Sequence, residues 1–255
     1  MDIHQEMMGI KQVPSIVLDS VQDKIASDVH GKHIVYSGAG SGKSSMVCER
    51  VSRLIERHGV NPNNILLLSF SRDAAQVLRD RLRHDVNIRT VHSLCYLILY
   101  NELQKYDSNL FHTGKDRIKV CSGWQQRNII KDILNDDEDI IANEVLQEIS
   151  FAKNRMQYKA GNKISTGNAH YDDIMYVYEA EKYNQGMIDF SDFVLLSINI
   201  LKSSKRILKK YQNQFPYIIV DEGQDTLYSL HKIIELLVQD NVCYFLDNRQ
   251  SIYGF

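Results

Sequence analysis

Proline and cysteine are scarce in this chain, and both shortages narrow the possible folds. Only 3 prolines and 13 glycines interrupt 255 residues, a composition that favours long helices. The 4 cysteines are scattered, and no two of them have the CxxC spacing of a zinc site. A disulfide framework or a metal centre built on cysteine is therefore disfavoured, and reduced thiols in a cytoplasmic protein are the plain expectation.

Two further features are missing, an excess of positive charge and a long apolar run. Lys and Arg number 30 against 32 Asp and Glu, which excludes a histone-like nucleic-acid binder but leaves room for a local basic groove. Apolar runs such as 65–68 and 94–99 are too short to cross a bilayer, and the polar N-terminus has no signal-peptide core. With 44% hydrophobic and 24% charged residues, we expect an ordinary globular protein without a membrane partner.

Apolar patterning predicts an α/β fold for the two ends of the chain. Short buried strands are expected at 33–36, 65–70, 217–220 and 242–246, and amphipathic helices follow the first three of them. Strand–helix alternation of this kind indicates a parallel sheet. The middle, about 101–204, is polar and helical, so we expect a discontinuous domain, 1–100 and 205–255, interrupted by a mostly helical subdomain.

A glycine-rich turn lies between the first strand and the first helix, Ser37-Gly38-Ala39-Gly40-Ser41-Gly42-Lys43-Ser44-Ser45. Such glycines let backbone N–H groups converge on phosphate oxygens at a helix N-terminus. Lys43 would reach the β- and γ-phosphates of ATP, and the Ser44 hydroxyl would bind Mg²⁺. Ser37 stands where the strict pattern has glycine. The alternative is a glycine-rich turn in which Gly-Lys-Ser occurs by chance.

An acidic pair, Asp221 and Glu222, directly follows the apolar run 217–220. Carboxylates at the end of a strand beside a phosphate loop suit two roles. Asp221 would hold Mg²⁺, and Glu222 would orient and deprotonate the attacking water. Taken alone, such a pair could equally be a solvated turn.

Several strings, in order along nearly the whole chain, resemble the UvrD/Rep family of superfamily 1 DNA helicases. They are Leu18-Asp19-Ser20-Val21-Gln22, the phosphate loop, Leu68-Ser69-Phe70-Ser71-Arg72-Asp73, Thr90-Val91-His92-Ser93, Met187-Ile188-Asp189-Phe190-Ser191-Asp192-Phe193, Asp221-Glu222-Gly223-Gln224-Asp225-Thr226 and Gln250-Ser251-Ile252-Tyr253-Gly254-Phe255. The resemblance implies a P-loop NTPase of RecA-like fold, a parallel sheet flanked by helices with a helical insertion subdomain.

The resemblance also implies roles for individual residues. Gln22 would read adenine, Arg50 would lie near the nucleotide, and Gln250 would act in catalysis by sensing the γ-phosphate. The residues that would contact single-stranded DNA are Phe70, Ser71, Thr90, His92, Tyr253 and Phe255. Aromatic faces stack on bases regardless of sequence, although each aromatic could instead be a core residue at a strand end.

Some positions depart from the family's pattern. Gly223 stands where an aromatic residue or alanine is usual, and Phe245-Leu246 replaces Val-Gly. Val91 occupies an aromatic position, and Asn248-Arg249 stands where acidic residues are common. None of these changes removes a chemical group that ATP hydrolysis requires.

Two functions of different kinds remain open. The first is the N-terminal motor half of a 3′–5′ helicase, which acts on single-stranded DNA or a single-strand/duplex junction and needs a C-terminal half or a partner subunit to hydrolyse ATP fast. The second is a stand-alone ATP- and DNA-binding module that docks to a partner. A nucleotide kinase is a remote third, which the Gln-Asp-Thr and Gln-Ser-Ile-Tyr strings oppose.

Overall fold

The computed structural model describes residues 18–38, 40–102, 119–135, 139–159, 163–223 and 227–247. The chain divides into two compact units. The first takes in the described residues up to Ser93, together with those of 205–226 and 234–255. The second takes in those of 94–204 and 227–233.

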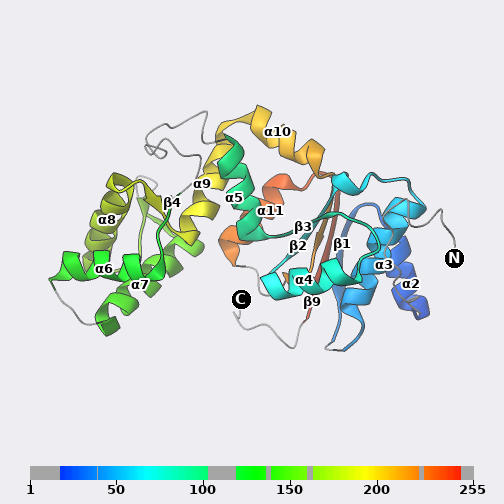
Figure 1. Ribbon diagram of the computed structural model, residues 1–255, viewed down its shortest axis with the longest axis horizontal. Helices are drawn as coiled ribbons and strands as arrows, with labels where there is room; N and C mark the ends of the chain where they lie inside the picture. Colours follow the sequence, from blue (N-terminus) through cyan, green and yellow to red (C-terminus); the bar gives the residue numbers. More distant parts are fainter. Residues whose placement is uncertain are drawn as a thin grey trace. The chain divides into compact units, whose positions relative to one another are not determined.

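A five-stranded, all-parallel sheet forms the centre of the first unit, with the strand order β1-β9-β8-β2-β3 (Figure 1). Its strands are β1 (Lys32–Tyr36), β2 (Ile65–Ser69), β3 (Asn87–Thr90), β8 (Tyr217–Val220) and β9 (Asn241–Leu246). The expected α/β class with a parallel sheet is confirmed. Because β8 and β9 lie between β1 and β2, segments from both ends of the sequence build one sheet.

The strands follow from their apolar runs, with one exception. All five residues of β2 are buried, as expected for a strand covered on both faces. Strand β3 lies at the edge of the sheet and buries only Ile88. Because its sequence has no apolar run, the apolar pattern did not predict this strand.

Side-chain caps define where two of the helices of this unit begin. Asp19 accepts hydrogen bonds from the backbone at the start of α2 and forms a capping box with Gln22. Ser71 accepts from the Ala74 N–H at the start of α4. Outside the strands, the regular elements of this unit are α2 (Ser20–Ser27), α3 (Lys43–Glu56), η1 (Pro62–Asn64), α4 (Arg72–Arg81), α10 (Lys205–Gln214) and the last residues of α11 (Tyr228–Leu237), whose first part belongs to the second unit.

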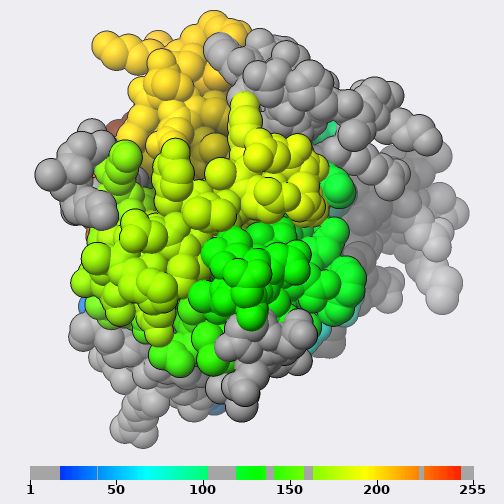
Figure 2. All heavy atoms as spheres, turned by 90° about the vertical axis from the view of Figure 1, so that its left-hand side faces the viewer, coloured from blue at the N-terminus to red at the C-terminus, as the bar shows by residue number. Residues whose placement is uncertain are grey.

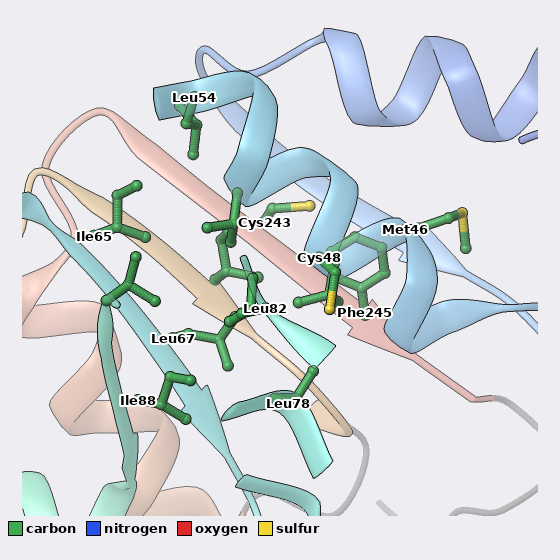
Figure 3. Close-up of a cluster of buried hydrophobic side chains, with 14 of the residues drawn as sticks. Met46, Cys48, Leu54, Ile65, Leu67, Leu78, Leu82, Ile88, Cys243 and Phe245 are labelled. Atoms are coloured by element: carbon green, nitrogen blue, oxygen red, sulfur yellow. The ribbon is translucent and has the colours of Figure 1, made fainter. Parts of the chain in front are cut away.

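The core of the first unit lies between the sheet and the helix that follows the phosphate loop. Figure 3 shows Cys48 and Leu54 of α3 close to Ile65, Leu67 and Cys243 of the strands. These side chains are almost completely buried. Burial of apolar surface on this scale fixes the height of α3 over the sheet and therefore the position of the loop at its N-terminus.

The second unit is mostly helical. Its elements are most of α5 (Val91–Glu102), α6 (Gly123–Leu134), α7 (Asp139–Asn154), α8 (Ala169–Asn184) and α9 (Phe190–Ser203), with the short strands β4 (Lys119–Val120), β5 (Tyr158–Lys159), β6 (Lys163–Ile164) and β7 (Met187–Ile188). Helix α6 packs against α7 and α8, and Figure 2 shows α8 in yellow-green beside the green helices. Its own core includes Ile130, Val145, Ile174 and Tyr178.

The second unit does not coincide with the segment 101–204 that the sequence suggests. It begins at Leu94 and also includes Leu227–Ile233. Leu94, Cys95, Ile98 and Leu99 are fully buried, and the Ser197 hydroxyl donates to the Cys95 carbonyl at 3.2 Å. These contacts join α5 to α9, so α5 belongs mostly to the helical unit.

Within the described ranges, no helix combines the length and the apolar character that are needed to cross a membrane.

Candidate nucleotide site

Three adjacent strands bring the predicted nucleotide-binding residues to one edge of the sheet. Strand β1 pairs with β9, and β9 pairs with β8, all parallel. The phosphate loop, the acidic pair and Asp247 each follow the carboxyl end of one of these strands. The Ser37 N–H donates to the Leu246 carbonyl at 3.0 Å, and the Asp221 N–H donates to the Leu68 carbonyl at 2.8 Å. This edge is where open parallel α/β sheets bind their ligands.

The phosphate loop has the backbone geometry that its glycines predict. Gly40 and Gly42 have φ values of 74° and 80°, a region that other residues rarely adopt. Gly42 is the N-cap of α3, and no side chain caps this helix. A Cβ atom added at Gly38 or Gly40 would meet nothing within 4 Å among the described residues. The first turn of α3 therefore offers backbone N–H groups to open space, which suits a phosphate.

Lys43 lies within reach of two carboxylates. Its Nζ is 3.0 Å from Glu222 Oε2 and 3.8 Å from Asp247 Oδ2. Asp247 is almost completely buried, whereas the Glu222 side chain is 30% exposed. Ser44 and Ser45 follow Lys43 in the first turn of α3 and are half-buried. The structure thus places Lys43 beside Glu222, with Ser44 next to Lys43 in the same helical turn.

Asp221 has the properties of a metal ligand. It is only 5% exposed, and its Oδ1 atom is buried without a hydrogen-bond partner among the described residues. Burial, reinforced by the charge of Glu222 and opposed by Lys43, raises the pKa of Asp221 to about 6. A buried carboxylate oxygen without a partner is costly unless a cation compensates it. The residues present therefore fit Mg²⁺, which Asp221 and the Ser44 hydroxyl would hold.

Glu222 has an uncommon backbone conformation. Its φ is +55°, one of three positive values among the described non-glycine residues. A left-handed conformation in a residue with a side chain costs roughly 1–3 kcal/mol and is found at functional sites more often than elsewhere. The turn therefore holds the Glu222 carboxylate beside Lys43 at an energetic cost.

The Gln22 amide is held by two backbone groups. Its Nε2 donates to the Ser41 carbonyl at 2.9 Å, and its Oε1 accepts from the Asp19 N–H at 3.0 Å. An amide carries two N–H donors and two lone pairs, so Nε2 and Oε1 each keep one further hydrogen-bonding position. Gln22 therefore lies next to the phosphate loop. Its contact with adenine, which offers an acceptor at N7 and a donor at N6, stays a prediction.

Arg50 contacts the backbone of α2. It is almost completely buried, and its Nη1 donates to the Ile25 carbonyl of α2 at 2.7 Å. The neighbouring Arg53 pairs with Asp23 at 2.6 Å and with Glu49 at 2.9 Å. Both arginines therefore tie α2 to α3. Binding of nucleotide by Arg50 stays a prediction.

The predicted DNA-binding residues lie at the adjacent ends of β2 and β3. Ser69 is paired with Thr90, so Phe70 and His92 follow neighbouring strands. Phe70 is 39% exposed, and its stacking on bases stays a prediction. Thr90 Oγ1 accepts from the Ser93 N–H at 3.2 Å, and burial lowers the pKa of His92.

Ser71 and Thr90 both have structural contacts, because their hydroxyls accept backbone hydrogen bonds at the starts of α4 and α5. Their contact with DNA stays a prediction. Four other predicted site residues lie outside the described residues, namely Ala39, Gln250, Tyr253 and Phe255.

A second group of charged side chains, the insertion cluster, lies in the helical unit and was missed by the sequence analysis. It consists of Lys153, Glu179, Lys182, Asp189 and Asp192. Lys182 Nζ is 2.5 Å from Asp189 Oδ2, 2.7 Å from Asp192 Oδ2 and 3.0 Å from Glu179 Oε2. Lys153 contacts the same three carboxylates. The three could group around a metal ion, but the two ammonium groups already fill that position.

Asp247 was also missed as a partner of Lys43. Its signal in the sequence was its place directly after the apolar run 242–246, at the same sheet edge as the phosphate loop. For the insertion cluster, the available signal was the pair Asp189 and Asp192, three residues apart at the start of a helix, which forms a capping box.

Fold and site together define the class. A parallel sheet with a glycine-rich phosphate loop before α3 and an acidic pair after β8 is a P-loop NTPase of RecA-like architecture. The sequence profile of the UvrD/REP helicase N-terminal domain matches residues 18–255, so the chain belongs to this family.

Curated relatives agree with this assignment. The chain is 29% identical, over 95% of its length, to a protein of Bacillus subtilis named putative ATP-dependent DNA helicase YjcD. It is 27% identical, over 93% of its length, to the ATP-dependent DNA helicase PcrA of Staphylococcus aureus. The matched regions make up 33% and 34% of those proteins. The chain therefore spans about a third of the length of these relatives.

Proposed function

We propose that this chain is the N-terminal, ATP-binding half of a 3′–5′ DNA helicase that couples ATP hydrolysis to movement along single-stranded DNA. The observation that carries the proposal is the group at the sheet edge, where Lys43, Asp221 and Glu222 meet in front of an uncapped helix N-terminus. The two relatives named above are both described as ATP-dependent DNA helicases.

Each residue has a distinct part in the proposed reaction. The first turn of α3 and Lys43 bind the phosphates, and Gln22 reads the adenine edge. Asp221 and the Ser44 hydroxyl would hold Mg²⁺, which would offset the negative charge of the phosphates. Lys43 now pairs with Glu222 at 3.0 Å. A γ-phosphate would give Lys43 a further anionic partner and free the Glu222 carboxylate to accept a proton from the attacking water.

All of these groups come from one side of the nucleotide. In related phosphoryl-transfer enzymes, an arginine supplied from the other side is worth about 10³–10⁵ in rate. We therefore expect residues 1–255 alone to bind ATP and to hydrolyse it slowly, with little stimulation by DNA. A C-terminal half, in the same chain or as a partner subunit, would complete the site.

Nucleotide binding is tested by thermal unfolding with and without Mg·ATP. At a ligand concentration of about 100 times Kd, native-state binding adds about 2.7 kcal/mol of stability. The stabilisation should disappear in Lys43→Ala and persist in Lys32→Ala, because Lys32 lies exposed on β1. Equal stabilisation of the wild type and Lys43→Ala would contradict the phosphate-loop assignment.

The motor role is tested by steady-state ATP hydrolysis and strand separation. Residues 1–255 should show slow hydrolysis and no strand separation, and addition of a relative's C-terminal half should raise turnover by orders of magnitude. If the added half binds but never raises turnover, the stand-alone binding module is the better description. Rapid DNA-stimulated hydrolysis by residues 1–255 alone would contradict the half-motor proposal.

A further inference from the structure

Two departures from the family's pattern meet in space. Gly223 directly follows Glu222, and Leu246 is the last residue of β9. A Cβ atom added at Gly223 would lie 2.6 Å from Leu246 Cδ2 and 3.2 Å from Tyr244 Cδ1. The first distance is shorter than real carbon contacts, so the Leu246 side chain occupies the space that any larger residue at 223 would need.

Lack of room for a side chain, and not an unusual backbone conformation, explains the glycine at position 223. Gly223 is absent from the residues with positive φ, whereas its neighbour Glu222 has φ +55°. Alanine could therefore adopt the backbone angles of Gly223. Among the described residues, the obstacle to a side chain at this position is the contact with β9.

Leu246 also touches the phosphate loop. Its carbonyl accepts the Ser37 N–H at 3.0 Å, and the Ser37 hydroxyl lies 3.5 Å from the same oxygen. One residue thus contacts both turns of the site, the loop through its backbone and the acidic turn through its side chain. Glu222 lies in the chain between two residues that contact the strands. The Asp221 N–H donates to the Leu68 carbonyl, and Gly223 lies against Leu246 of β9.

We propose that Gly223 and Leu246 form a positioning pair that holds the turn bearing Glu222 at a fixed distance from the phosphate loop. The inference rests on the proposed function of Glu222 as the base in ATP hydrolysis. Neither residue offers a side-chain group that could react, so both would act through the position of Glu222. A displacement of about 1 Å in such a group can cost about 10²-fold in rate.

The test separates binding from chemistry in the 255-residue chain. The Kd for Mg·ATP is measured by fluorescent-nucleotide displacement, and the hydrolysis rate by single turnover with enzyme in excess of labelled ATP. Gly223→Ala should lower the single-turnover rate by about 10²-fold and change Kd less than about threefold. Leu246→Ala, which opens space over Gly223, should lower the rate by a smaller factor.

The decisive variant combines both changes. In Gly223→Ala/Leu246→Ala the 2.6 Å contact is removed and the 3.2 Å contact with Tyr244 Cδ1 is the tightest that remains, so the rate should return to within about threefold of the Leu246→Ala value, a strongly non-additive result. Matched controls are Gly123→Ala, where a Cβ would meet its nearest neighbour at 3.8 Å, and Leu97→Ala at another half-buried leucine. Both should leave the rate and Kd unchanged.

Several outcomes would overturn the positioning pair. They are an unchanged rate in Gly223→Ala, an additive double variant, or a loss of ATP binding that accounts for the whole loss of rate. If Gly223→Ala does not fold, the proposal is tested with Leu246→Ala. An unchanged single-turnover rate in Leu246→Ala is then evidence against the positioning pair. A wild-type chain that neither binds nor hydrolyses ATP would instead refute the proposed function itself.

Discussion

Two groups of charged side chains, one in each unit, are built from the same residue types and differ in how completely they are paired. The phosphate-site cluster consists of Lys43, Asp221, Glu222 and Asp247, with one ammonium group for three carboxylates. The insertion cluster has two ammonium groups for three carboxylates, and each lysine contacts all three. Among the described residues, Asp221 Oδ1 of the phosphate-site cluster is a buried carboxylate oxygen without a hydrogen-bond partner, and no carboxylate oxygen of the insertion cluster is in that state.

Asp221 and Asp189, one from each cluster, have pKa shifts of opposite direction, although burial also raises the pKa of Glu179 in the insertion cluster. In the phosphate-site cluster, burial and the charge of Glu222 raise the pKa of Asp221 to about 6. In the insertion cluster, burial acts to raise the pKa of Asp189, but the ammonium groups of Lys153 and Lys182 outweigh it, so the pKa lies below its ordinary value. A charged network in which every buried polar atom has a partner stabilises a fold. A network with an unpartnered buried atom is typical of a site where a ligand supplies the missing partner.

Removal of the proposed base should give the largest effect and should act on chemistry alone. Glu222→Gln keeps the shape of the side chain but cannot accept a proton, so turnover of the completed motor should fall by about 10²–10⁴-fold. Mg·ATP should still raise the melting temperature. A variant that keeps most of its turnover would show that another group is the base.

Removal of one cation from the insertion cluster should affect stability instead. Lys153→Met keeps most of the aliphatic length and leaves carboxylates buried with too little positive charge. The free energy of unfolding should fall by about 3–5 kcal/mol, measured by denaturant titration. Lys163→Ala, at an exposed position of the same unit, should cost less than about 1 kcal/mol. A similarly small loss of stability in Lys153→Met would mean that full charge pairing in the insertion cluster does not stabilise the fold.

The smallest expected effect comes from the titration of Asp221, which should make the free energy of unfolding depend on pH. Because its pKa is higher in the native state than the usual 3.8, the native state holds this proton more tightly between about pH 4 and 6. Stability without ligand should therefore fall as the pH rises through that range, by an amount on the order of 2 kcal/mol. Denaturant titrations of the wild type and Asp221→Asn at several pH values give the difference, and parallel curves would contradict the assigned pKa.

The sequence predicted the central strands because each has its own apolar run. The run 217–220 became β8 with the expected bounds, and 65–70 became β2, one residue shorter. Strand β3 and the two-residue strands of the helical unit escaped prediction, because pairing with neighbours defines them and not their own composition. The start of the helical unit at Leu94 was equally unpredictable, since it depends on contacts between α5 and α9.

At the candidate site, motifs identified Lys43, Asp221 and Glu222, but not the contacts that position them. Asp247 as a second partner of Lys43 and the fit of Leu246 over Gly223 both require the parallel pairing of β8 with β9. For Arg50, the resemblance to the family suggests a position near the nucleotide. The sequence did not predict its hydrogen bond to the Ile25 carbonyl of α2, which depends on the packing of α2 against α3.

The amino-acid sequence by itself determined the α/β class, the phosphate loop and the identity of the acidic pair, because these depend on residue type over a few neighbouring positions. Only the tertiary structure decided which charges are satisfied. Lys153 and Lys182 meet their carboxylates across α7, α8 and α9, and Asp221 keeps an oxygen unpaired at the end of β8. Charge pairing depends on distances between residues far apart in the chain, and the packing of buried apolar side chains sets those distances.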